Sequence, residues 1–457
     1  MNTRTGRWVD DRLRVSSFTE EALTKVFPDH WLFMLGEIAL YSFIVLVLTG
    51  TFLAFFYQAS SVPVVYRGTY APLRGVDVST AYESVLNLSF DVRAGLVMRQ
   101  IHHWAALVFI GAIVAHLCRI FFTGAFRRPR EINWIIGITM MILGIFNGFA
   151  GYSLPDDLLS GTGLRIAYSI ALSVPLIGPW IAFLLFGGEF PSGQILGRLL
   201  VLHIFIVPAL LGVLLGIHLA IIWRQKHTQF PEAGRSESNV VGSRLWPTYA
   251  TKSVGLFFAI FAVLAALGGL VQINPIWLYG PFDPSQVTSP AQPDWYLGWI
   301  EGALRLFPPW EIRAFGREIP NPFFPGVLLP GITFALLYVW PFLEAWVTKD
   351  HDVHHLLDRP RDCPVRTALG TATLSFYVVL FLAASNDLLA HWFRVSVGAV
   401  TATFQILLLV IPPVVAFATY RLCRGLSRSG VSKFTEMPFS ALRSPRALAK
   451  RGGAPNP

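Results

Sequence analysis

The chain of 457 residues is 54% hydrophobic and only 14% charged, with a mean hydropathy of +0.54, which excludes a water-soluble protein of ordinary composition. Its 36 Lys and Arg against 27 Asp and Glu give a net charge of +9, an excess that cytoplasmic loops can hold without a nucleic-acid partner. Three widely separated cysteines, Cys118, Cys363 and Cys423, exclude a disulfide framework. The sequence contains no Cys-x-x-Cys-His, which excludes covalent attachment of a c-type haem.

Eight segments are long and apolar enough to cross a bilayer. About 20 apolar residues of helix span the hydrocarbon core, and a helix satisfies its own backbone hydrogen bonds there. The segments are 32–57, 95–121, 132–152, 199–223, 254–275, 323–347, 367–390 and 396–420. The sequence therefore predicts an all-α membrane protein with eight transmembrane helices.

A ninth apolar stretch, 166–188, is interrupted by Pro175, Gly178 and Pro179, so we expect a helical hairpin at the membrane interface instead of a span. The distribution of positive charge supports eight spans. With both termini in the cytoplasm, the inside segments hold 26 Lys and Arg and the outside loops hold 8, as the positive-inside rule requires.

These spans divide the chain into four expected regions. An amphipathic segment on the cytoplasmic surface (1–31) precedes a four-helix bundle (32–223). Four further helices follow (224–420), and then a basic cytoplasmic tail (421–457), which we expect to be disordered and to touch anionic lipid.

Two predicted spans contain pairs of histidines, and an ionisable side chain in a span is costly and indicates function. His102 and His116 in the second span are 14 residues apart, and His203 and His218 in the fourth are 15 apart. In an α-helix, 14 residues cover ~21 Å with a lag of ~40°, and 15 cover ~22.5 Å with a lead of ~60°. Each span therefore has two histidines on about one face at two depths. Because both spans run inward, His102 is level with His203, and His116 with His218.

This arrangement suits two haems stacked across the bilayer, each held between two histidines. We name His102 and His203 the outer pair, and His116 and His218 the inner pair. The alternative is that these histidines only form hydrogen bonds between helices; that explanation would be preferred for one histidine, but two matched pairs favour haems. His103 is a weaker ligand candidate, because it is turned ~140° away from the face of His116.

Two pairs of glycines have the same spacing as the histidines. Gly36 and Gly50 in the first span, and Gly137 and Gly151 in the third, are each 14 residues apart. A flat macrocycle between helices needs close backbone approach, which glycine allows. Ordinary packing of small residues explains one such pair equally well, but two pairs in phase with the histidines favour a bound macrocycle.

Three arginines lie close to the histidines in sequence. Arg99 precedes His102 by three residues, Arg119 follows His116 by three, and Arg198 precedes His203 by five. A guanidinium group can hold a haem propionate by charge-assisted hydrogen bonds. The alternative is that these arginines anchor the span ends at the membrane surface.

Together these motifs give the chain a family likeness: it resembles cytochrome b of the quinol:cytochrome c oxidoreductase (bc1) complexes over about residues 25–420. The residues that carry the resemblance are Arg99-Gln-Ile-His102, His116-Leu-Cys-Arg119, Gly36, Gly50, Gly137, Gly151-Tyr-Ser-Leu-Pro155, Arg198, His203, His218 and Pro293-Asp-Trp-Tyr296. The 15-residue spacing in the fourth span and the Asp in the last motif resemble the actinobacterial branch, because the mitochondrial branch has 14 and Glu.

The resemblance implies a fold, cofactors and partners. It implies that the four-helix bundle holds two non-covalent haem b groups in a multi-pass protein of the bacterial cell membrane. It implies menaquinol as the substrate, an iron–sulfur Rieske protein and a c-type cytochrome as partners, and a homodimer, and it leaves open an association with a terminal oxidase.

The resemblance also implies a reaction. Quinol is oxidised at an outer site; one electron goes to the Rieske cluster and the other passes through the outer and then the inner haem to a quinone near the cytoplasmic face. This Q-cycle contributes to the proton-motive force.

At the outer site, the resemblance makes Asp294 the acceptor of a quinol proton, with Tyr296 beside it as a catalytic residue and Tyr152 as a further hydrogen-bonding or packing group. A carboxylate with a tunable pKa suits that role. Without the resemblance, Asp294 would be interpreted as a loop carboxylate that caps a helix.

The inner site departs from the mitochondrial pattern of the family. Trp223 stands where the family often has a quinone-site histidine, and Ser253 stands where an Asp is expected. His227 and Lys252 are substitute polar contacts, or equally well ordinary loop residues.

Other polar groups in the sequence have no assigned role. Glu37 and Glu344 are acids within spans. His351, His354 and His355 have a spacing that metal sites use, but a hydrated cytoplasmic loop explains them better.

Two functions from other classes compete with this one. A di-haem membrane anchor of a hydrogenase or dehydrogenase needs fewer spans and leaves Pro293–Tyr296 unexplained. A proton-coupled transporter with histidine relays would bind no haem and would be expected to have inverted repeats.

Overall fold

The computed structural model describes residues 4–286, 292–314 and 316–428. Within these residues, eight helices are long and apolar enough to cross a membrane, and each matches one predicted span. They are Trp31–Ala54, Gly95–Phe122, Glu131–Tyr152, Ile195–Gln225, Leu245–Leu270, Phe324–Thr348, Pro364–Ala383 and Val397–Ser427. Many large apolar side chains on them are exposed, such as Leu48, Phe205 and Leu409 at 60–76%, as expected for helices that face lipid.

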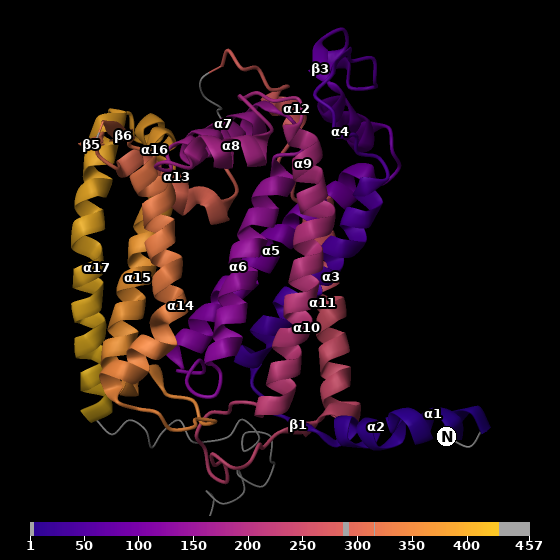
Figure 1. Cartoon of the computed structure of the whole chain (residues 1–457), viewed down its shortest axis with the longest axis vertical. Coiled ribbons are helices and arrows are strands. Elements are labelled where there is room, and N and C mark those ends of the chain that lie inside the picture. Colours follow the sequence, from indigo (N-terminus) through magenta and orange to yellow (C-terminus); the bar gives the residue numbers. More distant parts are fainter. Residues whose placement is uncertain (1–3, 287–291, 315, 429–457) are drawn as a thin grey trace, which may run out of the picture.

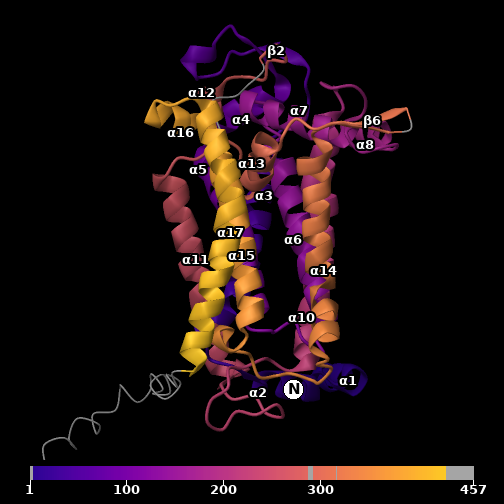
Figure 2. The same ribbon diagram turned by 90° about the vertical axis from the view of Figure 1, so that its left-hand side faces the viewer.

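The spans consist of named elements whose axes lie roughly along the long axis of the molecule (Figures 1 and 2). The elements are α3 (Met34–Ala54), α5 (Gly95–Phe122), α6 (Glu131–Tyr152), α9 (Ile195–Val201), η3 (Leu202–Ile206), α10 (Val207–Gln225), η4 (Leu245–Tyr249), α11 (Ala250–Leu270), η6 (Phe324–Leu328), α14 (Leu329–Thr348), α15 (Pro364–Ala383) and α17 (Val397–Arg428). The helix α17 runs eight residues into the predicted tail, to Arg428, and the rest of that tail lies outside the described residues.

The predicted interfacial hairpin is formed by two short helices, α7 (Leu158–Leu172) and α8 (Gly178–Phe186), which lie across one end of the bundle (Figure 1). The chain breaks between them at Pro175, as its missing N–H group requires. Asp157 caps α7 through a reciprocal capping box with Ser160. We call this end of the bundle the loop pole.

The loop pole also carries the short elements between the spans. These are β2 (Pro63–Val65), η2 (Ala71–Leu73), β3 (Asp77–Ser79), α4 (Thr80–Phe90), α12 (Ile276–Tyr279), η5 (Trp295–Leu297), α13 (Gly298–Leu306), β5 (Ile312–Ala314), β6 (Arg317–Ile319) and α16 (Asn386–Phe393). The strands form antiparallel pairs, β2 with β3 and β5 with β6, which an all-α prediction did not include.

At the opposite end, the N-terminal pole, α1 (Arg4–Leu13) and α2 (Val15–Thr24) extend sideways from the bundle (Figure 1). The strand β1 (Val26–Phe27) pairs with β4 (Ser243–Arg244), which holds the N-terminal segment against the stretch before α11. The turns η1 (Trp31–Phe33) and η7 (Pro360–Asp362) precede α3 and α15.

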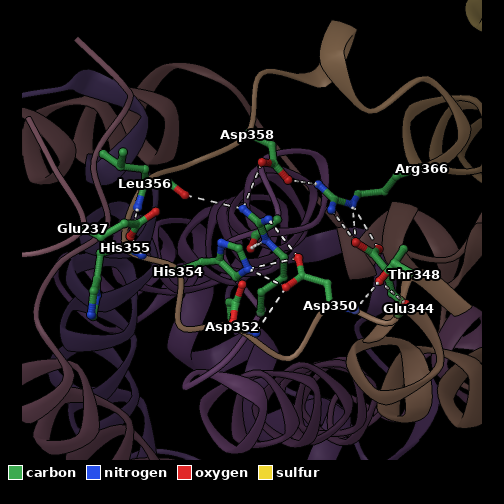
Figure 3. Close-up of polar contacts among 12 residues, drawn as sticks. Glu237, Glu344, Thr348, Asp350, Asp352, His354, His355, Leu356, Asp358 and Arg366 are labelled. Atoms are coloured by element: carbon green, nitrogen blue, oxygen red, sulfur yellow. Dashed lines mark hydrogen bonds and ion pairs between the residues drawn. The ribbon is translucent and has the colours of Figure 1, made fainter. Parts of the chain in front are cut away.

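A buried ionic cluster ties α14 and α15 together at the N-terminal pole (Figure 3). Nε of Arg366 donates to both carboxylate oxygens of Glu344 at 3.0 Å, and its Nη1 lies 2.7 Å from Asp358. Arg127, from the loop after α5, also binds Asp358 at 2.9 Å. The Arg366 and Glu344 side chains are only 8% and 13% exposed, so each charge depends on its partner.

The histidines at 351–355 are held in the same region by ordinary contacts. Nε2 of His354 lies 3.0 Å from the Asp350 carboxylate, and Nδ1 of His355 accepts a hydrogen bond from Arg130 at 2.8 Å. Figure 3 draws His354 beside Asp350.

Removal of Arg366 would leave the Glu344 carboxylate buried without its partner, at a cost of about 3–5 kcal/mol. We expect Arg366→Leu to lower the Tm of the detergent-solubilised protein, measured by heating and gel filtration. Arg313→Leu is the control, because Arg313 is 77% exposed and its bond to Glu318 is a surface pair of about 0–1 kcal/mol. Equal Tm shifts for both variants would contradict the role of the cluster.

Candidate functional site: two histidine pairs between four helices

The outer pair lies between α5 and the turn η3. The ring centroids of His102 and His203 are 6.1 Å apart. Nδ1 of His203 donates to the Asn147 carbonyl oxygen at 2.9 Å, and Nδ1 of His102 lies 2.9 Å from the Thr49 hydroxyl. Such bonds orient each ring and leave Nε2 for a metal. Two imidazoles that share a metal ion at bonds of about 2 Å have ring centres roughly 6 Å apart, so the pair fits one iron.

The inner pair lines a cavity of about 470 Å³ between α3, α5, α6 and α10. Most of its wall is apolar, with Phe109, Met141 and Leu215 among the lining residues. Nδ1 of His116 is buried and has no hydrogen-bond partner among the described residues. An apolar cavity with imidazoles on two helices that line it fits a flat apolar macrocycle that histidine would hold.

A π-helical turn explains why the two spans tolerate different histidine spacings. The turn η3, Leu202–Ile206, contains His203 and precedes Pro208, which has no N–H to donate. A π turn accommodates one extra residue within an α-helix. With one residue taken up by the π turn, the rotation from His203 to His218 is that of about 14 α-helical residues. The expected lead of ~60° therefore becomes a lag of ~40°, the same as between His102 and His116 on α5.

Three of the four predicted glycines lie against the histidine rings. A methyl group added at each would come within 3.3 Å of a ring carbon, tighter than ordinary contact. At Gly137 a methyl group would meet nothing within 4 Å, and this glycine lines the inner cavity. The distances are 3.3 Å for Gly36 to His116, 3.0 Å for Gly50 to His102 and 2.3 Å for Gly151 to His203.

Two of the three predicted arginines have guanidinium atoms free for an anion. Nε of Arg99 and Nε of Arg119 are buried and have no hydrogen-bond partner among the described residues. The remaining bonds of Arg99 and Arg119 run to Asn274 at 2.9 Å and Thr228 at 3.4 Å. A buried donor without a partner is costly, so both sites suit a bound propionate.

Arg198 makes different contacts. Its guanidinium donates to the carbonyl oxygens of Phe183 and Leu184 at the end of α8, and to Gln194 at 3.1 Å. None of these partners belongs to the outer pair. The contacts favour a role in fixing the interfacial hairpin.

The motif Pro293-Asp-Trp-Tyr296 brings its carboxylate to α5. Nε2 of His103 lies 2.8 Å from Oδ1 of Asp294, and the Tyr296 hydroxyl donates to Oδ2 at 3.0 Å. Burial and the Asp294 charge raise the pKa of Tyr296 well above its ordinary value, so the phenol remains a donor. Tyr152 is also buried, with its hydroxyl against Gly163.

Sequence analysis missed the partnership of His103 with Asp294. His103 follows His102 of the outer pair and therefore points away from the face on which that pair lies. Nothing in the sequence indicates which loop covers the opposite face of α5.

The residues at which this sequence differs from the mitochondrial pattern lie at the N-terminal pole, together with the polar residues considered as their substitutes. Ser253 donates to Glu37 at 2.6 Å, and Lys252 pairs with Asp29 at 2.7 Å. His227 lines the inner cavity, where burial and the charges of Lys25 and Arg130 lower its pKa to about 4. Trp223 lines the same cavity.

Comparison with known proteins shows the family and the fold. The family model for cytochrome b (N-terminal)/b6/petB matches residues 107–281. The solved structure of a hyperthermophilic respiratory Complex III has the same fold, with a TM-score of 0.64 at 19% identity over 91% of this chain and 99% of that one.

Three actinobacterial relatives carry the description cytochrome bc1 complex cytochrome b subunit. That of Mycobacterium tuberculosis is 54% identical over 92% of this chain and 77% of its own length. Those of Corynebacterium diphtheriae and Streptomyces coelicolor are 51% and 48% identical over 93% and 94% of this chain, and 78% and 79% of their own lengths. The chain therefore belongs to the cytochrome b subunits of bc1 complexes, the membrane core of quinol:cytochrome c oxidoreductases.

Proposed function

We propose that the outer pair and the inner pair each bind one haem b through their Nε2 atoms. The observation that carries this proposal is the match between two histidine pairs at two depths and the glycines that bring neighbouring helices against them. When bound, the haems supply one-electron transfer between the two poles. The protein would set their separation along α5 on one side and along η3 and α10 on the other.

The buried Nε atoms of Arg99 and Arg119 support a second part of the proposal. Each guanidinium group would hold a haem propionate, Arg99 near the outer pair and Arg119 near the inner pair. An ionised carboxylate gives each arginine the partner that its burial requires. Arg198 receives no such role, because its guanidinium group donates to the Phe183 carbonyl oxygen in α8 and to the Gln194 side chain.

Asp294 would accept a proton from a quinol hydroxyl at the loop pole. Oxidation of a quinol releases two electrons and two protons, and a positioned carboxylate takes one proton as the O–H bond breaks. His103 and Tyr296 hold one carboxylate oxygen each, so they position Asp294. The general position of this loop at the pole opposite the N-terminus supports release of the proton outside the cell.

The proposal also includes the substrate, the partner subunits and the membrane in which the complex lies. We infer menaquinol as the substrate, a Rieske protein and a c-type cytochrome as partners, and a homodimer in the bacterial cell membrane, since the curated relatives are subunits of cytochrome bc1 complexes. Both termini would face the cytoplasm, which the predicted charge distribution supports. The anchor and transporter alternatives lose support because the relatives match 92–94% of the chain, including the last four spans.

The ligand assignment predicts which haem each variant loses. His102→Ala and His203→Ala should remove the same haem, and His116→Ala and His218→Ala the other, because each pair shares one iron. Optical redox titration of the purified variants distinguishes the two haems. Loss of different haems within one pair would contradict the pairing.

The role of Asp294 predicts that Asp294→Asn slows quinol oxidation by about 100-fold or more, the usual contribution of a positioned base, and changes its pH profile. Stopped-flow reduction of the b haems by a naphthoquinol measures the step. Asp283→Asn is the control, since the Asp283 carboxylate accepts a hydrogen bond from the Ser285 N–H within its own turn. A full rate with an unchanged pH profile in Asp294→Asn would remove this residue from the proton path.

A further inference from the structure

Two acids within the spans have opposite surroundings. Glu344 is bound by the Arg366 guanidinium (Figure 3), so its charge is compensated and its role is structural. Glu37, in the first turn of α3, has no Lys or Arg nitrogen within 4 Å among the described residues. An acid near a membrane interior without a cation is costly as a fixed charge and indicates function.

Neutral donors surround the Glu37 carboxylate. The Tyr249 hydroxyl donates to Oε1, and the Ser253 hydroxyl donates to Oε2 at 2.6 Å. The Tyr41 hydroxyl lies 3.4 Å from Oε2 and is also bonded to Ser253. These groups come from α3, η4 and α11, so three elements fix the carboxylate. Hydrogen bonds from neutral groups hold it in place without a fixed counter-charge.

Glu37 lies between two cavities. It follows Gly36, where an added methyl group would meet the inner ligand His116. Glu37 and Tyr249 line the cavity of the inner pair and also a second cavity of about 230 Å³ at the N-terminal pole. The second cavity is lined by Asp29, His30, Trp31, Met34, Lys252 and Ser253, among others.

The second cavity connects the carboxylate with the surface. Lys252 and Asp29, which pair at 2.7 Å, are 51% and 42% exposed. Both line the same cavity as Glu37. Water that enters beside this pair can therefore bring protons to the carboxylate.

The position of Glu37 accounts for the departure at Ser253. The family resemblance predicts an acid at position 253 on α11, and Ser253 instead donates its hydroxyl to Glu37 across the interface with α3. Glu37 therefore supplies a carboxylate from the neighbouring helix within one hydrogen bond of position 253.

We propose that Glu37 is the acid that protonates quinone at the inner site, which rests on the proposed function. Reduction of a quinone to a quinol adds two electrons and two protons, and in the reaction of the family the two electrons come one each from two quinols oxidised at the outer site. The O–H bond of Glu37 breaks, and a new O–H bond forms on a quinone carbonyl oxygen. Water beside Asp29 and Lys252 returns a proton to the carboxylate and supplies the second one.

The experiment measures oxidation of the reduced complex by quinone. The purified complex is reduced with limiting dithionite and mixed with 2,3-dimethyl-1,4-naphthoquinone, and the b-haem absorbance is followed. We expect Glu37→Gln to slow this oxidation by about 100-fold, as for loss of a positioned acid. Glu232→Gln, which removes a 53% exposed surface acid, should leave it unchanged.

An exchange of side chains gives a sharper comparison. Glu37→Ser should be slow, and Glu37→Ser combined with Ser253→Asp should recover most of the rate, because the carboxyl group returns to the same cluster from α11. If Glu37→Gln does not assemble, these two variants carry the test, and equal rates for them overturn the proposal.

A second readout does not depend on turnover. The infrared difference spectrum between oxidised and naphthoquinol-reduced complex should contain a protonated-carboxyl band that Glu37→Gln lacks and Glu232→Gln retains. An unchanged band, or oxidation of Glu37→Gln at the parental rate, overturns the proposal while the proposed function stands. Absence of b-haem absorbance from the parental complex would contradict the proposed function itself.

Discussion

The structure depends on placing imidazole nitrogens inside a lipid-facing helical bundle, where no solvent satisfies them. A polar group without a partner is costly in that environment. The outer rings are oriented by the Thr49 hydroxyl and the Asn147 carbonyl, and glycines at positions 36, 50 and 151 allow neighbouring backbones to approach the rings. Metal coordination by the remaining nitrogen would complete the bonding of each ring.

The buried charges fall into two classes with different consequences. Arg366, Glu344 and Asp358 compensate one another and connect α14 with α15. Within the described part of the chain, Arg99 and Arg119 retain a buried Nε without a partner, and the carboxylate of Glu37 is bound by neutral donors alone. Charged groups that are paired with each other stabilise the helices. Charged groups without an ionic partner among the described residues lie beside the histidine pairs, where they would bind an anion or transfer a proton.

Much of the architecture could be predicted from the sequence because it follows from local rules. Hydropathy located the eight spans, and the break at Pro175 indicated the hairpin, since both depend on the segment itself. The spacing of the histidines predicted two levels because helix geometry is regular. The π turn at His203 was not predicted, since one extra residue in a long apolar helix leaves no local signal.

Contacts between distant segments could not be predicted in the same way. The bond of His103 to Asp294 joins residues 191 positions apart, and that of Glu37 to Ser253 joins residues 216 apart. Arg198 is bound to α8 although its spacing from His203 favoured a propionate. Sequence spacing limits which residues share a face, but tertiary packing decides which group meets that face.

Each histidine pair is proposed to hold one iron. The most direct measurement is the haem content of the purified complex, by pyridine haemochrome assay against the amount of this chain, together with a redox titration of the b-type absorbance. The account predicts two haem b groups per chain that are reduced in two separate steps. A single haem per chain, or none, would contradict it.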